Sequence, residues 1–142
     1  VFTMTSKETY FVLGGTGRQG KATINALVAK GVQPIVTTSR NPDSRSAQKL
    51  LEIDGVTKVL KADMTDVDSV FDAIKESGSS RIWFTTDYYS LGWWPTRAKE
   101  AKQGTNVIDA ILKVGSDQIK HVVYSSVGDA DNCASNISHF WS

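Results

Sequence analysis

The chain has 142 residues, of which 40% are hydrophobic and 22% charged, and its formal net charge is +1. This composition is typical of one globular domain. The near-neutral charge excludes a strongly basic nucleic-acid-binding protein, and no apolar run approaches the ~20 residues of a transmembrane helix.

Short apolar runs alternate with helical patterns along the chain. The first helix is predicted over residues 18–30, where Ile24, Leu27 and Val28 share one face and Gly31 follows. The strands are expected at residues 10–14, 34–39, 56–63, 81–86 and 121–126.

Three further helices are predicted from capping residues and periodic apolar positions. The second helix begins at Asp43 or Ser44, and the third begins at Thr65 or Asp66. The longest covers residues 95–114. The expected buried positions are Ala47, Leu50 and Leu51 in the second helix, Val67, Val70, Phe71 and Ile74 in the third, and Ala98, Ala101, Thr105, Ile108 and Leu112 in the longest.

Strands that alternate with helices in this way form βαβ units. The fold class is therefore predicted as α/β: a Rossmann-type, doubly wound parallel sheet of about five strands with helices on both faces.

The segment after the first strand is rich in glycine. Gly15, Gly17 and Gly20 fit G-x-G-x-x-G, and Gly14, Gly17 and Gly20 are three residues apart. Between a strand and a helix, this pattern predicts a dinucleotide-binding loop, with the pyrophosphate at the helix N-terminus. Thr16 and Arg18 add hydrogen-bond donors. The alternative is a glycine-rich turn that binds no ligand.

The end of the second strand distinguishes NAD from NADP. Arg40 lies 20 residues after Gly20, where an acidic residue would bind a ribose hydroxyl and an arginine accommodates a 2′-phosphate. Arg40, with Ser39 beside it, therefore predicts NADP(H), unless Arg40 is simply an exposed turn residue. Arg45 is an alternative phosphate ligand.

The third strand is followed by Asp63 and Met64. At this edge of the sheet, Asp63 is expected to accept a hydrogen bond from the adenine amino group, and Met64 to pack on the ring. The alternative is that Asp63 caps the start of the next helix.

The motifs GGTGRQG, TSRNP, ADMTD, TTDYYS, AKQGTNVIDA and HVVYSS together resemble the NmrA-like group of atypical short-chain dehydrogenases. The resemblance covers residues 9–141 and implies a Rossmann domain that binds NADP(H). The cofactor-binding roles that it implies fall on Gly14, Thr16, Gly17, Arg18, Gln19, Gly20, Arg40, Asp63, Met64, Thr85, Thr86, Ser125 and Ser126.

The resemblance also sets expected boundaries along the chain. Residues 1–8 are interpreted as a disordered or vector-derived N-terminus, residues 9–130 as the NADP(H)-binding domain, and residues 131–142 as a tail leading to a C-terminal substrate lobe that this chain lacks. The lysine that follows a comparable stretch in the family is absent.

No catalytic residue is predicted. The Tyr-x-x-x-Lys pair of ordinary short-chain dehydrogenases is absent, because no tyrosine of the chain has a lysine four residues on. Lys102 in the longest helix is a candidate contact to the nicotinamide ribose or an ordinary solvated lysine. The loop 87–95, DYYSLGWWP, forms either a wall over the nicotinamide or a packing surface.

The resemblance to the NmrA-like group and the motif residues are compatible with three functions. They are an NADP(H)-binding regulatory or redox-sensing module, an NADPH-dependent reductase of a quinone or other small carbonyl compound, and an interaction domain that no longer binds cofactor. If the chain ends at Ser142, the fifth strand is an unprotected edge and Phe140 and Trp141 lack a partner, so a homodimer or protein partner is expected.

A cytoplasmic protein, with the nucleus as the alternative, is expected from its single cysteine, Cys133. Because Cys133 has no suitably spaced histidine or cysteine, no metal site is predicted.

Overall fold

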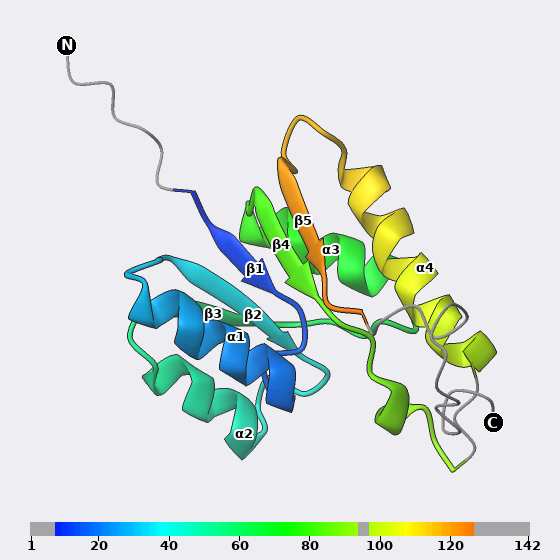
Figure 1. The fold of residues 1–142 in the computed structure, drawn as a ribbon, viewed down its shortest axis with the longest axis horizontal. Coiled ribbons are helices and arrows are strands. Elements are labelled where there is room, and N and C mark those ends of the chain that lie inside the picture. Colours follow the sequence, from blue (N-terminus) through cyan, green and yellow to red (C-terminus); the bar gives the residue numbers. More distant parts are fainter. Residues whose placement is uncertain (1–7, 94–96, 127–142) are drawn as a thin grey trace, which may run out of the picture.

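The computed structural model describes residues 8–93 and 97–126. Within them, five parallel strands form one sheet in the order β3-β2-β1-β4-β5 (Figure 1). The chain builds outward from β1 to β3, then crosses back to β4 on the other side of β1. The strands are β1 (Tyr10–Val12), β2 (Ile35–Ser39), β3 (Val56–Lys61), β4 (Arg81–Phe84) and β5 (His121–Tyr124).

Helices cover both faces of the sheet, which confirms the predicted doubly wound α/β class. One apolar cluster joins β1 and β4 to α3 and α4, and a second joins β1 and β2 to α1 and η1. Figure 1 shows α1 and α3 on opposite sides of the sheet. The helical elements are α1 (Arg18–Ala29), α2 (Arg45–Gln48), η1 (Lys49–Glu52), α3 (Val67–Ser77), η2 (Tyr88–Ser90) and α4 (Arg97–Val114).

Alternate residues of the strands supply these two clusters. Phe11, Ile82 and Phe84 pack toward α3 and α4, whereas Val12 and Ile35 pack toward α1 and η1. Every residue of β2 is buried, as expected for a strand covered on both faces. The middle strands are therefore packed on both faces, and the loops of the candidate site begin at the ends of these buried strands.

The predicted buried face of α4 was wrong. Ile108 is 41% exposed and Leu112 is 72% exposed. The apolar pattern misplaced the face because two polar residues, Gln103 and Asn106, are buried and bonded to backbone groups of neighbouring loops. The buried residues of α4 are Gln103, Asn106, Val107, Ala110 and Ile111.

The predicted burial of Leu51 was also wrong, since this side chain is 41% exposed. The second helix gives way to the 3-10 turn η1 after Gln48. The tighter winding of a 3-10 turn changes which residues share a face. Ala47 and Leu50 are buried as predicted.

Asp66 is the N-terminal cap of α3. Its carboxylate accepts hydrogen bonds from the N–H groups of Asp68 at 3.0 Å and Ser69 at 3.3 Å. We expect Asp66→Ala to lower the free energy of unfolding by about 1 kcal/mol, because both N–H groups lose their acceptor. Urea unfolding measures this, with Asp72→Ala on the exposed face of α3 as the control. Equal effects of the two changes would contradict the capping role.

The β5 side of the sheet is open in the part of the chain that the structure describes. All four residues of β5 are exposed.

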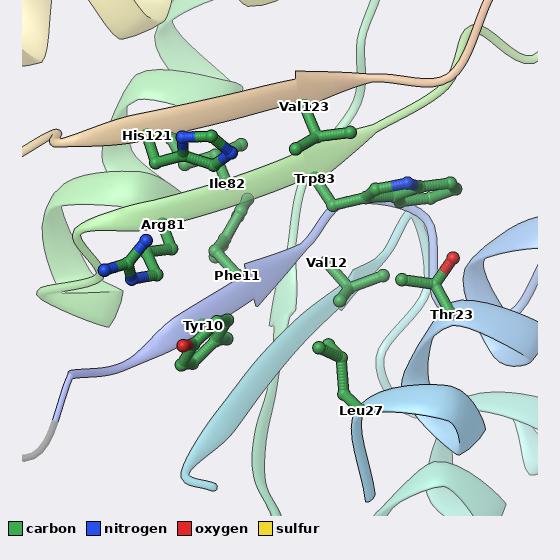
Figure 2. A pocket seen from close by; sticks show the side chains of 10 residues that line it. All are labelled: Tyr10, Phe11, Val12, Thr23, Leu27, Arg81, Ile82, Trp83, His121 and Val123. Carbon is green, nitrogen blue, oxygen red and sulfur yellow. The ribbon is translucent and has the colours of Figure 1, made fainter. Parts of the chain in front are cut away.

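A cavity of about 290 Å³ lies along the α1 face of β1, β4 and β5, with Trp83 and Val123 over one end and Leu27 of α1 opposite (Figure 2). The cavity runs along the face of the sheet rather than at its carboxyl edge. The expected self-association through β5 stays a prediction, and Phe140 and Trp141 lie outside the described residues.

Candidate cofactor-binding site

The carboxyl ends of the five strands meet at one edge of the sheet, and the strand order reverses between β1 and β4. Ligands of open α/β sheets bind at such a switch point. The predicted site residues follow the strand ends at this edge: residues 14–20 after β1, residues 39–40 at the end of β2, residues 63–64 after β3, residues 85–86 after β4, and residues 125–126 after β5. Lys102 is exposed on α4, and its predicted role is untested.

The glycine loop is closed tightly on itself. Gly14 has a φ of +77°, which favours glycine, and the Gly17 N–H donates to the Gly14 carbonyl oxygen at 3.1 Å. A Cβ on Gly20 would lie 2.2 Å from that same oxygen. The loop therefore brings the start of α1 against β1 and leaves no side chain at Gly17, where a pyrophosphate would approach. This geometry fits a dinucleotide.

Two threonines of β2 fix this loop, and neither was predicted as a site residue. The Thr38 hydroxyl oxygen accepts from the Gly14 N–H at 2.9 Å, and the Thr38 carbonyl oxygen accepts from the Gly15 N–H at 3.1 Å. The buried Thr37 hydroxyl donates to the Val12 carbonyl oxygen at 2.7 Å. The available signal was a run of three hydroxyl residues, Thr37 to Ser39, in a five-residue buried strand.

The N-terminus of α1 is open to an anion. Its cap is Gly17, which has no side chain to accept the first N–H groups, and the first turn holds no acidic residue. Thr16, Arg18 and Gln19 beside it are exposed. Free N–H groups and the helix dipole give this end a partial positive charge, which suits phosphate.

Ser125 connects the end of β5 to the start of α1. Its hydroxyl donates to the Gln19 side-chain oxygen at 2.8 Å, and its carbonyl oxygen accepts from the Thr85 hydroxyl at 2.9 Å. The structure thus brings together three predicted residues from three separate segments. Ser126 follows with an exposed side chain.

Arg40 is exposed at the end of β2, and its guanidinium lies 3.9 Å from the Asp87 carboxylate. Asp87 was missed as a site residue because only the fold brings it near Arg40. Ser39 is buried, and its hydroxyl donates to the Asn41 carbonyl oxygen at 3.0 Å. The Ser39 hydroxyl thus supports the turn that follows β2, and a role as phosphate donor stays a prediction.

Asp63 organises the turn between β3 and α3. Its carboxylate accepts from the Thr65 N–H at 2.8 Å and from the Thr65 hydroxyl at 2.7 Å. Met64 packs against the α3–α4 core cluster, and its carbonyl oxygen accepts from the Asn106 side chain at 2.9 Å. The N-terminal cap of α3 is Asp66. The alternative prediction, that Asp63 caps this helix, was therefore wrong. The predicted adenine contacts are untested.

The pKa of Asp63 is lowered, chiefly by the hydrogen bond from the Thr65 N–H, with smaller contributions from the Thr65 hydroxyl and the charges of Arg40 and Lys61. A carboxyl whose pKa is lowered on folding contributes stability above its unfolded pKa and loses it as the pH falls through the folded pKa.

We expect Asp63→Asn to lower the free energy of unfolding at neutral pH, and to lower it by less in acid. Urea unfolding at neutral and at acidic pH measures this loss of stability, with Asp72→Asn as control. A loss of stability that is the same at the two pH values would contradict the role of the Asp63 charge.

The loop after β4 is tied to α4. The Thr86 hydroxyl donates to the Glu100 carboxylate at 2.6 Å, and the Asp87 N–H donates to the Gln103 side-chain oxygen at 2.9 Å. Tyr89 and Trp93 of this loop are 92% and 91% exposed. Trp94 and Pro95, also expected in this aromatic loop, lie outside the described residues.

Neither a metal site nor a membrane span is found in the described ranges. Residues 8–93 and 97–126 hold no group of three or more His, Cys, Asp or Glu side chains that could bind a metal ion. In the same ranges, no helix is long and apolar enough to cross a membrane. Cys133 lies outside them.

Fold and loop geometry define a Rossmann-type α/β domain, and the sequence comparisons identify its family. The profile of the NmrA-like family matches residues 6–141. The chain therefore belongs to the NmrA-like family.

Two proteins similar to this chain are much longer than it is. An NmrA-like family domain-containing protein of Dictyostelium discoideum is 29% identical over 116 residues, which cover 82% of this chain and 35% of that protein. An NmrA-like family domain-containing oxidoreductase of an Aspergillus species is 28% identical over 129 residues. The match covers 89% of this chain and 36% of that protein. The chain spans about a third of the length of these relatives.

Solved structures share the fold. An Escherichia coli NADPH-dependent quinone oxidoreductase, solved with NADPH, is 29% identical with a TM-score of 0.65, and the match covers 87% of this chain and 38% of that one. NmrA, a negative transcriptional regulator, is 23% identical with a TM-score of 0.66. The match covers 88% of this chain and 35% of the NmrA chain.

Proposed function

We propose that this chain binds NADP(H) at the carboxyl edge of its sheet and serves as a redox-sensing or regulatory module. The observation that carries the proposal is the loop of residues 14–20, whose tight glycine turn and open helix N-terminus lie at the same edge of the sheet as Arg40, the residue that follows β2. Residues 9–130 are the proposed cofactor-binding domain.

The preference for NADP(H) over NAD(H) rests on charge. Arg40 occupies the position that faces the adenosine ribose in this fold, and no acidic residue stands there to bind a 2′-hydroxyl. A guanidinium forms two parallel hydrogen bonds to a phosphate. The quinone oxidoreductase that is 29% identical was solved with NADPH, which supports the same choice.

A regulatory role is favoured because the chain offers no proton donor of the Tyr-x-x-x-Lys kind. Its residues supply phosphate binding and orientation, whereas hydride chemistry belongs to the cofactor. The proposal includes a reducing compartment, the cytoplasm or the nucleus, in keeping with the single cysteine of the sequence.

The second candidate function is reduction of a quinone or other small carbonyl compound. The likeness to the quinone oxidoreductase favours it. Hydride from NADPH and a proton from solvent would convert a quinone to its hydroquinone, leaving NADP⁺, and this step depends more on positioning than on a strong acid.

Consumption of NADPH separates the two candidates. Purified protein is incubated with NADPH and a soluble benzoquinone or naphthoquinone, and the near-ultraviolet absorbance of NADPH is followed against a blank without protein. The regulatory proposal predicts binding of NADPH with no consumption beyond the blank. Quinone-dependent consumption that Gly17→Glu abolishes would establish the reductase instead. Folded protein that binds none of the nicotinamide cofactors would favour an interaction domain.

A further inference from the structure

Asp87 forms an ion pair across the candidate site. Its carboxylate lies 3.9 Å from the Arg40 guanidinium, although Arg40 follows β2 and Asp87 lies beyond the end of β4. In the sheet, β1 lies between these two strands. The contact therefore joins two loops on either side of the strand that carries the glycine loop.

The backbone of Asp87 is held firmly in this position. Its N–H donates to Gln103, whose side chain is 4% exposed on α4. Its carbonyl oxygen accepts from the Ser90 hydroxyl at 3.1 Å and from the Ser90 N–H at 3.3 Å. Helix α4 and the turn η2 thus fix the position of the Asp87 backbone, from which the side chain reaches the Arg40 guanidinium.

The charge of Arg40 acts on two acidic residues. Besides Asp87, the Asp63 carboxylate lies within electrostatic reach of the guanidinium. A phosphate on Arg40 must share that guanidinium with the Asp87 carboxylate, and the two anions repel each other. An uncharged 2′-hydroxyl meets no such repulsion.

We propose that Asp87 is a specificity-determining residue, whose carboxylate competes with a 2′-phosphate for Arg40 and so narrows the discrimination between NADPH and NADH. The inference rests on the proposed function. The side chains of Arg40 and Asp87 are 62% and 44% exposed, so solvent screens the competition. We expect Asp87→Asn to tighten NADPH binding about twofold to fivefold and to leave NADH binding unchanged.

The substitution Asp87→Asn removes the negative charge and little else. Asparagine keeps the size of the side chain, and the hydrogen bonds to Gln103 and Ser90 use the backbone of residue 87. Asp109→Asn is the matched control, because Asp109 is an exposed carboxylate of α4 that lies six residues, or ~9 Å along the helix, beyond Gln103, which holds the Asp87 backbone.

The test is calorimetric titration of NADPH and NADH into the wild-type chain, Asp87→Asn and Asp109→Asn at low and high salt, with folding checked by circular dichroism. The expected result is a higher NADPH-to-NADH affinity ratio for Asp87→Asn alone, larger at low salt and lost in the Arg40→Ala background. An unchanged or lowered ratio, with the wild type binding NADPH, would overturn only the role of Asp87. A wild-type chain that binds no NADPH would overturn the proposed function as well.

Discussion

Gly20→Ala is expected to abolish NADP(H) binding and to lower the free energy of unfolding by about 1–3 kcal/mol. The added Cβ would lie 2.2 Å from the Gly14 carbonyl oxygen, 2.8 Å from the Gly14 carbonyl carbon and 3.0 Å from the Gly15 Cα. All three are backbone atoms, so no flexible side chain can move aside. Relief of the clash requires α1 to move away from β1, which opens the loop that would hold the pyrophosphate.

Gly104→Ala is the matched control, because Gly104 also lies inside a helix. Its Cβ would approach only the Thr86 Cγ2, at 3.6 Å, which is ordinary van der Waals contact. We expect this variant to be as stable as the wild type or up to about 1 kcal/mol more stable, from the higher helix propensity of alanine. Urea unfolding and NADPH titration compare the two variants. A Gly20→Ala protein that keeps both stability and binding would show that the close approach of α1 to the loop is unnecessary.

Arg40→Ala is expected to weaken NADPH binding about 10- to 100-fold while leaving NADH binding within about twofold of the wild type. A hydrogen bond to a charged group contributes about 1.5–3 kcal/mol, and each 1.4 kcal/mol is a tenfold change in affinity. Arg40 is exposed, and none of this loss should come from unfolding.

Arg45→Ala is the control, because Arg45 is the other arginine close enough in sequence to take this role. It is exposed on the short helix α2. Calorimetric titration of both cofactors into both variants measures the effect. Should Arg45→Ala lose the phosphate preference and Arg40→Ala keep it, the phosphate ligand would be Arg45.

The parts of the fold that depend on local patterns were predictable from the sequence. The five strands, the helix after the glycine loop and the apolar face of α3 all follow from periodicity and capping, and the structure confirms them. The positions of the glycine loop and Arg40 were also predictable, because both follow strands whose carboxyl ends must meet in a parallel sheet.

Contacts between distant segments were not predictable in the same way. The bonds from Gly14 to Thr38 and from Ser125 to Gln19 join residues 24 and 106 positions apart. The buried face of α4 was misassigned because burial of Gln103 depends on its hydrogen bond to the Asp87 backbone, which no hydropathy pattern records. Polar residues with fold-dependent partners therefore account for both the wrong helix face and the missed site residues.

The central claim, that this chain binds NADP(H), is tested most directly by titrating NADPH, NADP⁺, NADH and NAD⁺ separately into the purified chain by calorimetry. The account predicts saturable binding of NADPH and NADP⁺ at one site, with NADH and NAD⁺ about 10- to 100-fold weaker. Folded protein that binds none of the four, or binds the forms with and without the 2′-phosphate equally well, would contradict it.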